Sequence, residues 1–248
     1  MRRLRGFSLI ELLVVIGVIA VLAAIMAPVC VNAKKSAVRS ACQSNLSQIG
    51  RAFNAYLSDY DSSYPNTDNQ YLWSGYYWRE TMRRYVGISR AAGSEGTRQM
   101  ILACPADPTP SGIYAGTSYA YSAAFYMTPE QVDSVADGNY LRTKYSATNP
   151  KLPCSTIKAS LVKFASKKIM VAEYWTLHSA NTKVGWYDGP ESGNDPWSGA
   201  RNSLFADNHV KFVPTKQIHP AQSPLVSRPR SLPDINLTRN GVYGKDID

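Results

Sequence analysis

Near the start of the chain, the twenty residues from Leu12 to Val31 carry no charged side chain. At about 1.5 Å rise per residue, a helix of this length spans about 30 Å, the thickness of the hydrocarbon core of a bilayer. The stretch therefore predicts a membrane-spanning helix. Because Arg2, Arg3 and Arg5 precede it, we expect the N-terminus to be cytoplasmic and the rest of the chain to form an extracytoplasmic head.

One carboxylate, Glu11, interrupts the apolar residues. A carboxylate inside a membrane helix costs roughly 2.5–3.5 kcal/mol on insertion scales, and such acids usually have a partner. Cleavage between Gly6 and Phe7 would create a new α-amine at Phe7, four residues before Glu11 and on the same helix face. Pairing of this amine with the carboxylate, within one chain or between neighbours, would remove most of the cost of burial.

The segment Gly6–Ile16, GFSLIELLVVI, resembles the class III signal of type IV pilins and type II secretion pseudopilins. In that signal a basic leader ends at a Gly, a Phe becomes the first mature residue, and a Glu follows near the start of the mature chain. The resemblance implies cleavage after Gly6 by prepilin peptidase and N-methylation of Phe7. It also implies that Glu11 meets the Phe7 amine of a neighbouring subunit during assembly, and that Pro28 kinks the helix.

Three other interpretations of the N-terminus fit these residues less well. A secretory signal peptide would use Val31-Asn32-Ala33 as its cleavage site, but the apolar run is long and contains Glu11. A lipoprotein would use Cys30, but Val29 stands where a small residue is required. A plain single-span anchor does not explain Glu11.

The sequence predicts an α+β fold in which a long N-terminal helix packs on a small antiparallel sheet. Its first half spans the membrane, and its second half has an apolar stripe at Val38, Cys42, Leu46, Ile49, Phe53, Leu57 and Tyr60. The predicted parts are a leader at 1–6, a transmembrane and assembly helix at 7–31, an amphipathic helix at 32–60, a globular head at 61–213, and a Pro-rich, partly mobile tail at 214–248.

Local patterns within the head predict its shorter elements. Short helices are expected at residues 71–86 and Thr128–Val135, and strands at Ser118–Met127, Leu161–Phe164 and Lys168–Trp175. The segment Asn202–Val213 predicts a hairpin with a tight turn at Asp207-Asn208.

Three head segments resemble a subgroup of pseudopilin-like proteins identified as pilin or secretion-system G-like. They are ACQSNLSQIG at Ala41–Gly50, CPADP at Cys104–Pro108, and the hairpin NSLFADNHV that begins at Asn202. In that subgroup a His precedes an Asp-Gly pair by a fixed gap. Here Trp197 occupies the position of that His, so its role does not carry over. Asn208 replaces the Gly, and the turn survives because Asn tolerates a positive φ.

Four cysteines leave the disulfide connectivity open. Cys30 lies in the membrane run, so Cys42, Cys104 and Cys154 remain in the head, where disulfides are permitted. The first candidate bridge joins Cys42 to Cys104, and the second joins Cys104 to Cys154. Buried thiols at Cys42 and Cys104 are the remaining alternative.

No cofactor is predicted, and calcium is the one metal with a candidate site. Some pseudopilins hold Ca²⁺ in a C-terminal loop, and oxygen ligands suited to a hard ion cluster here at Asp188, Glu191, Asp195 and Asp207. A zinc site made of Cys104, Cys154 and His178 lacks the usual ligand spacing. HExxH, GxSxG, CxxC and P-loop motifs are all missing from the sequence, so no enzyme is predicted.

The net charge of +9 falls to +6 when the three arginines of the leader are removed. The charges are scattered, which is typical of a solvated surface, so a nucleic-acid partner is not expected. The sequence predicts a structural subunit of a type II secretion pseudopilus or type IV pilus-like filament, single-pass in the bacterial inner membrane. Its expected partners are other pilin-like subunits, prepilin peptidase, the inner-membrane assembly platform and membrane lipid. The alternatives are a minor pilin whose basic head binds DNA or a surface, and a membrane-tethered enzyme.

Overall fold

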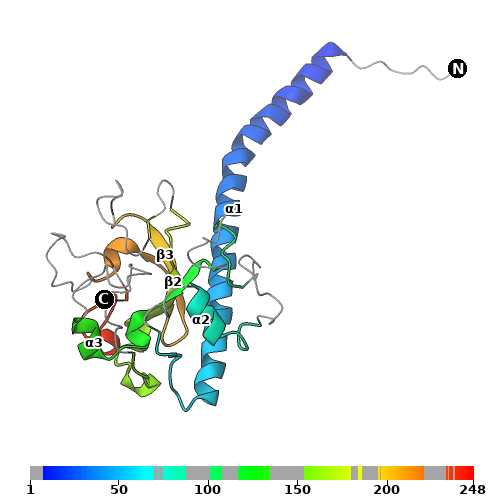
Figure 1. Ribbon diagram of the computed structural model, residues 1–248. Helices are drawn as coiled ribbons and strands as arrows, with labels where there is room; N and C mark the ends of the chain where they lie inside the picture. Colours follow the sequence, from blue (N-terminus) through cyan, green and yellow to red (C-terminus); the bar gives the residue numbers. More distant parts are fainter. Residues whose placement is uncertain are drawn as a thin grey trace, which may run out of the picture. The chain divides into compact units, whose positions relative to one another are not determined.

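The computed structural model describes residues 8–69, 72, 75–87, 101–107, 117–134, 154–179, 184–185, 195, 197–220, 233, 235–236 and 238–248. The chain forms two compact units, Met1–Ser40 and Ala41–Asp248. One long helix, α1 (Leu9–Asp59), contributes to both (Figure 1). With a four-stranded antiparallel sheet in the second unit, the predicted α+β, pilin-like fold is confirmed.

Among the described residues, the first unit is the part of α1 that ends at Ser40, and most of this part is apolar. This helix is long and apolar enough to cross a membrane, and none of its apolar stretch is buried. Large side chains from Leu9 to Val31 are exposed, and Pro28 lies inside the helix without ending it. A helix that is apolar on all sides is suited to lipid or to other helices rather than to water.

The sheet of the second unit has the strand order β1-β2-β3-β4. Its strands are β1 (Tyr119–Tyr121), β2 (Ile169–Glu173), β3 (Ala200–Phe205) and β4 (Val210–Pro214). Every residue of β1, β2 and β3 is buried, so both faces of these strands are covered. The predicted strand at Lys168–Trp175 and the predicted hairpin, whose turn has Asn208 at φ 70°, are confirmed.

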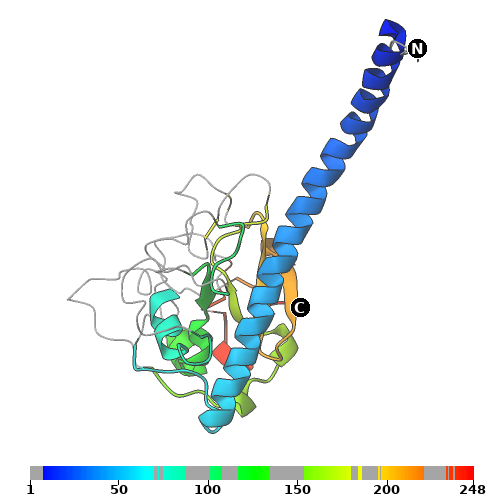
Figure 2. The ribbon, with the colours of Figure 1, turned by 90° about the vertical axis from the view of Figure 1, so that its right-hand side faces the viewer.

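The second part of α1 lies against this sheet (Figure 2). Its buried positions include Cys42, Leu46, Ile49 and Phe53, which the apolar stripe predicted. The Phe53 ring is 5.2 Å from the ring of Tyr121 on β1. The prediction is wrong at the end of the stripe, where Tyr60 is 51% exposed. The helix ends at Asp59, and the Tyr60 ring instead stacks on that of Tyr56.

Two short helices follow the sequence patterns closely. Within the predicted 71–86, helix α2 covers Gly75–Thr81; it buries Trp78, and the turn after it buries Met82. Helix α3 (Pro129–Ser134) begins with reciprocal hydrogen bonds between Thr128 and Gln131. These bonds form a capping box that satisfies two otherwise unpaired backbone N–H groups.

Two of the predicted strands are wrong in whole or in part. Of Ser118–Met127, only Tyr119–Tyr121 is a strand. The Ser122 hydroxyl then accepts a hydrogen bond from the Ala124 amide and starts a 3₁₀ turn. The segment Leu161–Phe164 is not a strand, because 3₁₀ turns at Ala159–Leu161 and Ala165–Lys167 occupy this region. The side-chain cap at Ser122 and, in the second region, backbone contacts such as that of the Ala159 amide with Ser62 O override the β-propensity of these apolar residues.

Within the tail predicted at 214–248 to be Pro-rich and partly mobile, the described residues 238–248 are packed, so mobility is wrong for this part. Val242, Asp246 and Ile247 are buried against the rest of the second unit. The Lys168 ammonium donates to Asp246 Oδ1 at 2.8 Å, with both side chains fully buried. The Asp246 carboxylate also accepts from the Ile169 amide at 2.6 Å. This aperiodic segment is held by contacts to residues about 78 positions away in the chain. No local sequence pattern therefore predicts that the segment is ordered.

Candidate functional site

The N-terminal end of α1 is the first candidate site. Gly6 and Phe7, the expected cleavage and methylation positions, lie outside the described residues. The helix begins just after Ser8. The Ser8 amide donates to Glu11 Oε2 at 2.8 Å, and the Glu11 amide donates to the Ser8 hydroxyl at 3.2 Å. These two reciprocal bonds form a capping box at the helix start.

The capping box gives Glu11 a structural role that the sequence reasoning missed. The signal was nevertheless visible, because Ser8 and Glu11 have the S-x-x-E spacing before an apolar run. The cap uses Oε2 of the carboxylate. A carboxylate has two oxygens with about four acceptor positions, so capping leaves acceptor capacity for an approaching amine. The acid also lies at the positive end of the helix dipole, which stabilises negative charge.

The second candidate site is formed by cysteines of the head. Cys42, on α1, and Cys104 form a disulfide with a Cα–Cα distance of 5.0 Å. This is the first of the two bridges that the sequence left open. Cys154 lies outside this bridge and remains a thiol, like Cys30. Burial, with a smaller contribution from the Asp68 carboxylate, raises the pKa of Cys154 to about 11. Its thiol is therefore protonated at neutral pH.

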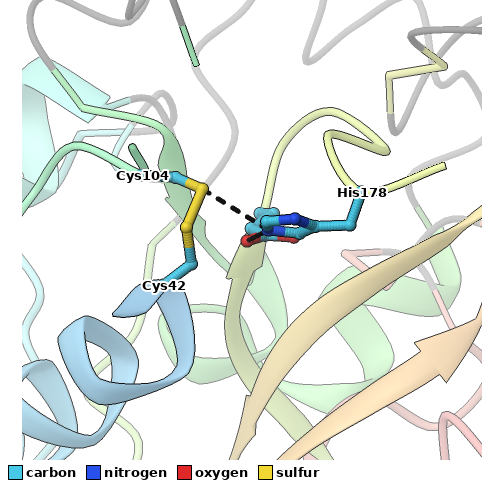
Figure 3. Close-up of side chains that lie close together, drawn as sticks. Cys42, Cys104 and His178 are labelled. Atoms are coloured by element: carbon cyan, nitrogen blue, oxygen red, sulfur yellow. Dashed lines mark hydrogen bonds and ion pairs between the residues drawn. A yellow bond between two sulfur atoms is a disulfide. The ribbon is translucent and has the colours of Figure 1, made fainter. Parts of the chain in front are cut away.

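A histidine and a carboxylate lie beside the disulfide. His178 Nε2 is 3.5 Å from Cys104 Sγ (Figure 3) and 3.0 Å from Glu173 Oε1. The Glu173 side chain, on β2, is fully buried, and that of His178 is 6% exposed. Burial and then the charge of Glu173 raise the pKa of the adjacent Tyr119. Sequence reasoning did not find Glu173, and it placed His178 with Cys154 rather than with Cys42.

The other histidines of the head also lie beside carboxylates. His209 Nδ1 is 2.6 Å from Asp207 Oδ1, and His219 Nε2 is 3.2 Å from Asp248 Oδ1. The His209–Asp207 pair belongs to the turn between β3 and β4, where the Asp207 carboxylate also accepts from the His209 amide. These exposed pairs stabilise loops locally and form no triad with a nucleophile in the contacts described here.

The predicted calcium site is only partly within the described residues. Asp188 and Glu191 lie outside them. The Asp195 carboxylate accepts from the Trp197 amide at 3.0 Å, and Asp207 belongs to the hairpin turn. Both of these acids therefore already stabilise turns. Calcium binding stays a prediction.

The comparisons with known proteins bear on the N-terminal site. Residues 1–27 match the family model described as the prokaryotic N-terminal methylation motif. No curated protein and no solved structure matches the chain. The match covers the leader, Phe7, the capping box and most of the apolar part of α1.

This motif is the prepilin signal of type IV pilins and pseudopilins, so the predicted resemblance is confirmed. It indicates a type IV pilin-like or pseudopilin substrate of prepilin peptidase, a class that assembles into pilus-like filaments. The signal and the apolar helix also fit anchoring in a membrane at the N-terminus. Such a signal is structural, and no related enzyme is indicated.

Proposed function

We propose that this chain is a structural subunit of a type II secretion pseudopilus or a type IV pilus-like filament. Prepilin peptidase cleaves it after Gly6, Phe7 is methylated, and the apolar part of α1 packs with that of neighbouring subunits. The observation that carries the proposal is the methylation motif together with the apolar stretch at the start of α1, none of which is buried by the chain itself. Twenty such residues need lipid or other helices to cover them.

The charge pair between Glu11 and the neighbouring Phe7 amine gives this packing its register. The capping box supports the pair because it holds the carboxylate at the start of the helix while engaging only Oε2. In an apolar surrounding an unpaired carboxylate is costly, so the subunit gains most when an amine approaches. The three leader arginines support an orientation with the leader in the cytoplasm and the head outside, in the bacterial inner membrane.

Substitutions at Gly6 and Glu11 test processing and assembly separately. We expect Gly6→Val to block cleavage, so the purified chain retains the mass of residues 1–6. We expect Glu11→Ala to be cleaved normally but to yield few or no sheared filaments. The matched control is Glu130→Ala, which removes an exposed acid of the head and leaves both steps intact. Wild-type filament yield with Ala at position 11 would refute the charge pair, and a mature N-terminus at Phe7 in Gly6→Val would refute the cleavage site.

A further inference from the structure

We propose that the dithiol form of the head binds one Zn²⁺ through Cys42, Cys104, Glu173 and His178. One ligand atom from each of these four residues lies within 4.8 Å of the others. Every polypeptide is synthesised with its cysteines as thiols, so the dithiol form precedes the disulfide in the life of each chain. The proposal does not depend on the filament function.

The distances around His178 already resemble those of a tetrahedral zinc site. With Zn–S of about 2.3 Å and Zn–N or Zn–O of about 2.0–2.1 Å, the sulfur and nitrogen ligands of one ion lie about 3.5 Å apart. The separation of Cys104 Sγ from His178 Nε2 is 3.5 Å. The same geometry requires about 3.3 Å between nitrogen and oxygen, against 3.0 Å from His178 Nε2 to Glu173 Oε1.

The two sulfurs are the atoms that must move. They are 2.02 Å apart in the disulfide and would lie about 3.8 Å apart on zinc. Side-chain rotation can provide this change if the two backbones stay in place. Two contacts hold them without the disulfide: the Asn45 side chain donates to Ala103 O at 3.1 Å, and the Tyr119 hydroxyl donates to Cys42 O at 3.3 Å.

The carboxylate is oriented by groups that zinc would not displace. Glu173 Oε2 accepts from the Asn202 amide at 2.9 Å, while Oε1, which faces His178, accepts from the Asn202 side chain at 2.9 Å. The His178 ring lies edge-on to Phe212, with centroids 6.3 Å apart. Such surrounding contacts fix ligand orientation in metal sites. Two thiolates, one imidazole and one carboxylate are a donor set typical of tetrahedral zinc rather than of hard ions such as calcium.

The test uses full-length protein in detergent that carries Cys30→Ser and Cys154→Ser, so that only the two cluster cysteines remain. A water-soluble phosphine reduces the disulfide: two electrons pass from phosphorus to the S–S bond, which breaks. Water supplies the oxygen of the phosphine oxide and the two protons of the thiols. Zn²⁺ binding then releases these protons. We expect one zinc per reduced chain after gel filtration, and no zinc at this site in the oxidised chain.

Further measurements identify the ligands. X-ray absorption of the zinc-loaded chain should show two sulfur and two lighter ligands, and Co²⁺ should give thiolate charge-transfer and tetrahedral bands. Glu173→Gln and His178→Ala should each raise the Kd for zinc at least about 10-fold. A reduced chain that binds no zinc overturns the proposal, whatever the variants do. The proposal is also overturned if the Cys42→Ser and Cys104→Ser variants bind zinc as well as the parent chain does. Zinc coordinated by four sulfurs from two chains would overturn it too.

Discussion

At Gly50, helix α1 and the hairpin of β3 and β4 pack so closely that even one added side-chain carbon would clash. A Cβ built on Gly50 would lie 2.9 Å from Asn208 Oδ1 and 3.0 Å from Leu204 Cδ1. Asn208, at the turn between β3 and β4, also donates to the Asn54 side chain of α1 at 2.8 Å. The glycine therefore lets the hairpin approach the helix closely.

Gly50→Ala should destabilise the head although alanine is the better helix former. The added methyl group must displace Leu204 and Asn208, and overpacking of this kind typically costs about 1–3 kcal/mol, against a propensity gain of about 1 kcal/mol. We expect a lower Tm in thermal melts of the full chain. The control is Gly17→Ala, at which a Cβ meets nothing within 4 Å. An unchanged or higher Tm for Gly50→Ala would contradict the expected overpacking cost at this contact.

Cys154 should make the head less stable at alkaline pH. Its pKa rises in the folded state to about 11 from an ordinary value of 9.0. A raised pKa means that the folded chain holds the proton more tightly than the unfolded chain. Stability from this thiol is therefore complete below about pH 9 and is lost as the pH rises towards 11. Thermal melts from pH 8 to 11 should show a shallower decline for Cys154→Ser than for wild type. Parallel declines would contradict this, and Cys30→Ser should follow wild type.

At the residue scale, sequence reasoning rests on signals that are local. The relation of Gly6, Phe7 and Glu11 is contained in a few consecutive positions, and the family match covers all three. The contact of Gly50 with Asn208 joins positions far apart in the chain, so nothing near either residue predicts it. Sequence reasoning proposed the Cys42–Cys104 bridge as one of two candidates, but no motif spacing groups Glu173 and His178 with these cysteines, so it did not find the cluster of four.

At the scale of elements, periodicity and capping predicted the helices better than the strands. The apolar spacing of α1 and the Thr128–Gln131 cap of α3 are local properties, and both elements formed as expected. The strand expected over Ser118–Met127 ends after Tyr121, because the next residue bonds to the C-terminal segment. The Ser122 hydroxyl donates to Ile235 O at 2.8 Å. Only the folded chain brings these residues together.

The buried ion pair between Lys168 and Asp246 should control the order of the C-terminal segment. Asp246→Ala would leave the fully buried Lys168 ammonium with the Thr238 hydroxyl, 2.7 Å away, in place of a carboxylate. Removing one partner of a buried pair typically costs about 3–5 kcal/mol. We expect the free energy of unfolding in urea to fall by this amount, with faster amide exchange at residues 238–248.

Asp248→Ala is the matched control, since it removes a neighbouring acid whose side chain is 94% exposed and lies 3.2 Å from His219. Exposed pairs contribute little because water and salt screen them, so its unfolding curve should overlay that of the wild type. Equal effects of the two variants would mean that the C-terminal segment is held by something other than the Lys168 pair.

At the scale of the whole molecule, the two units have different roles, one in processing and assembly and the other in folding. The first unit carries the processing signal and an apolar helix with no buried stretch. The second carries the disulfide and the hydrophobic core, whose buried residues begin at Cys42. Among the described residues, none before Cys42 is buried.

A chain that begins at Ala41 should therefore fold as the full chain does. Deleting residues 1–40 removes exposed apolar side chains and, within the described residues 8–40, no buried one, so we expect a change in unfolding free energy below about 1 kcal/mol. For a domain of this size, that corresponds to a shift in Tm below about 2–4 °C. The shortened chain should stay soluble without detergent, retain the Cys42–Cys104 disulfide and form no filaments. Aggregation, or a much lower Tm at equal disulfide content, would show that the first unit stabilises the head. Because filament loss is expected with an intact fold, the same variant separates the two tasks: folding depends on the residues after Ser40, and assembly depends on those before it.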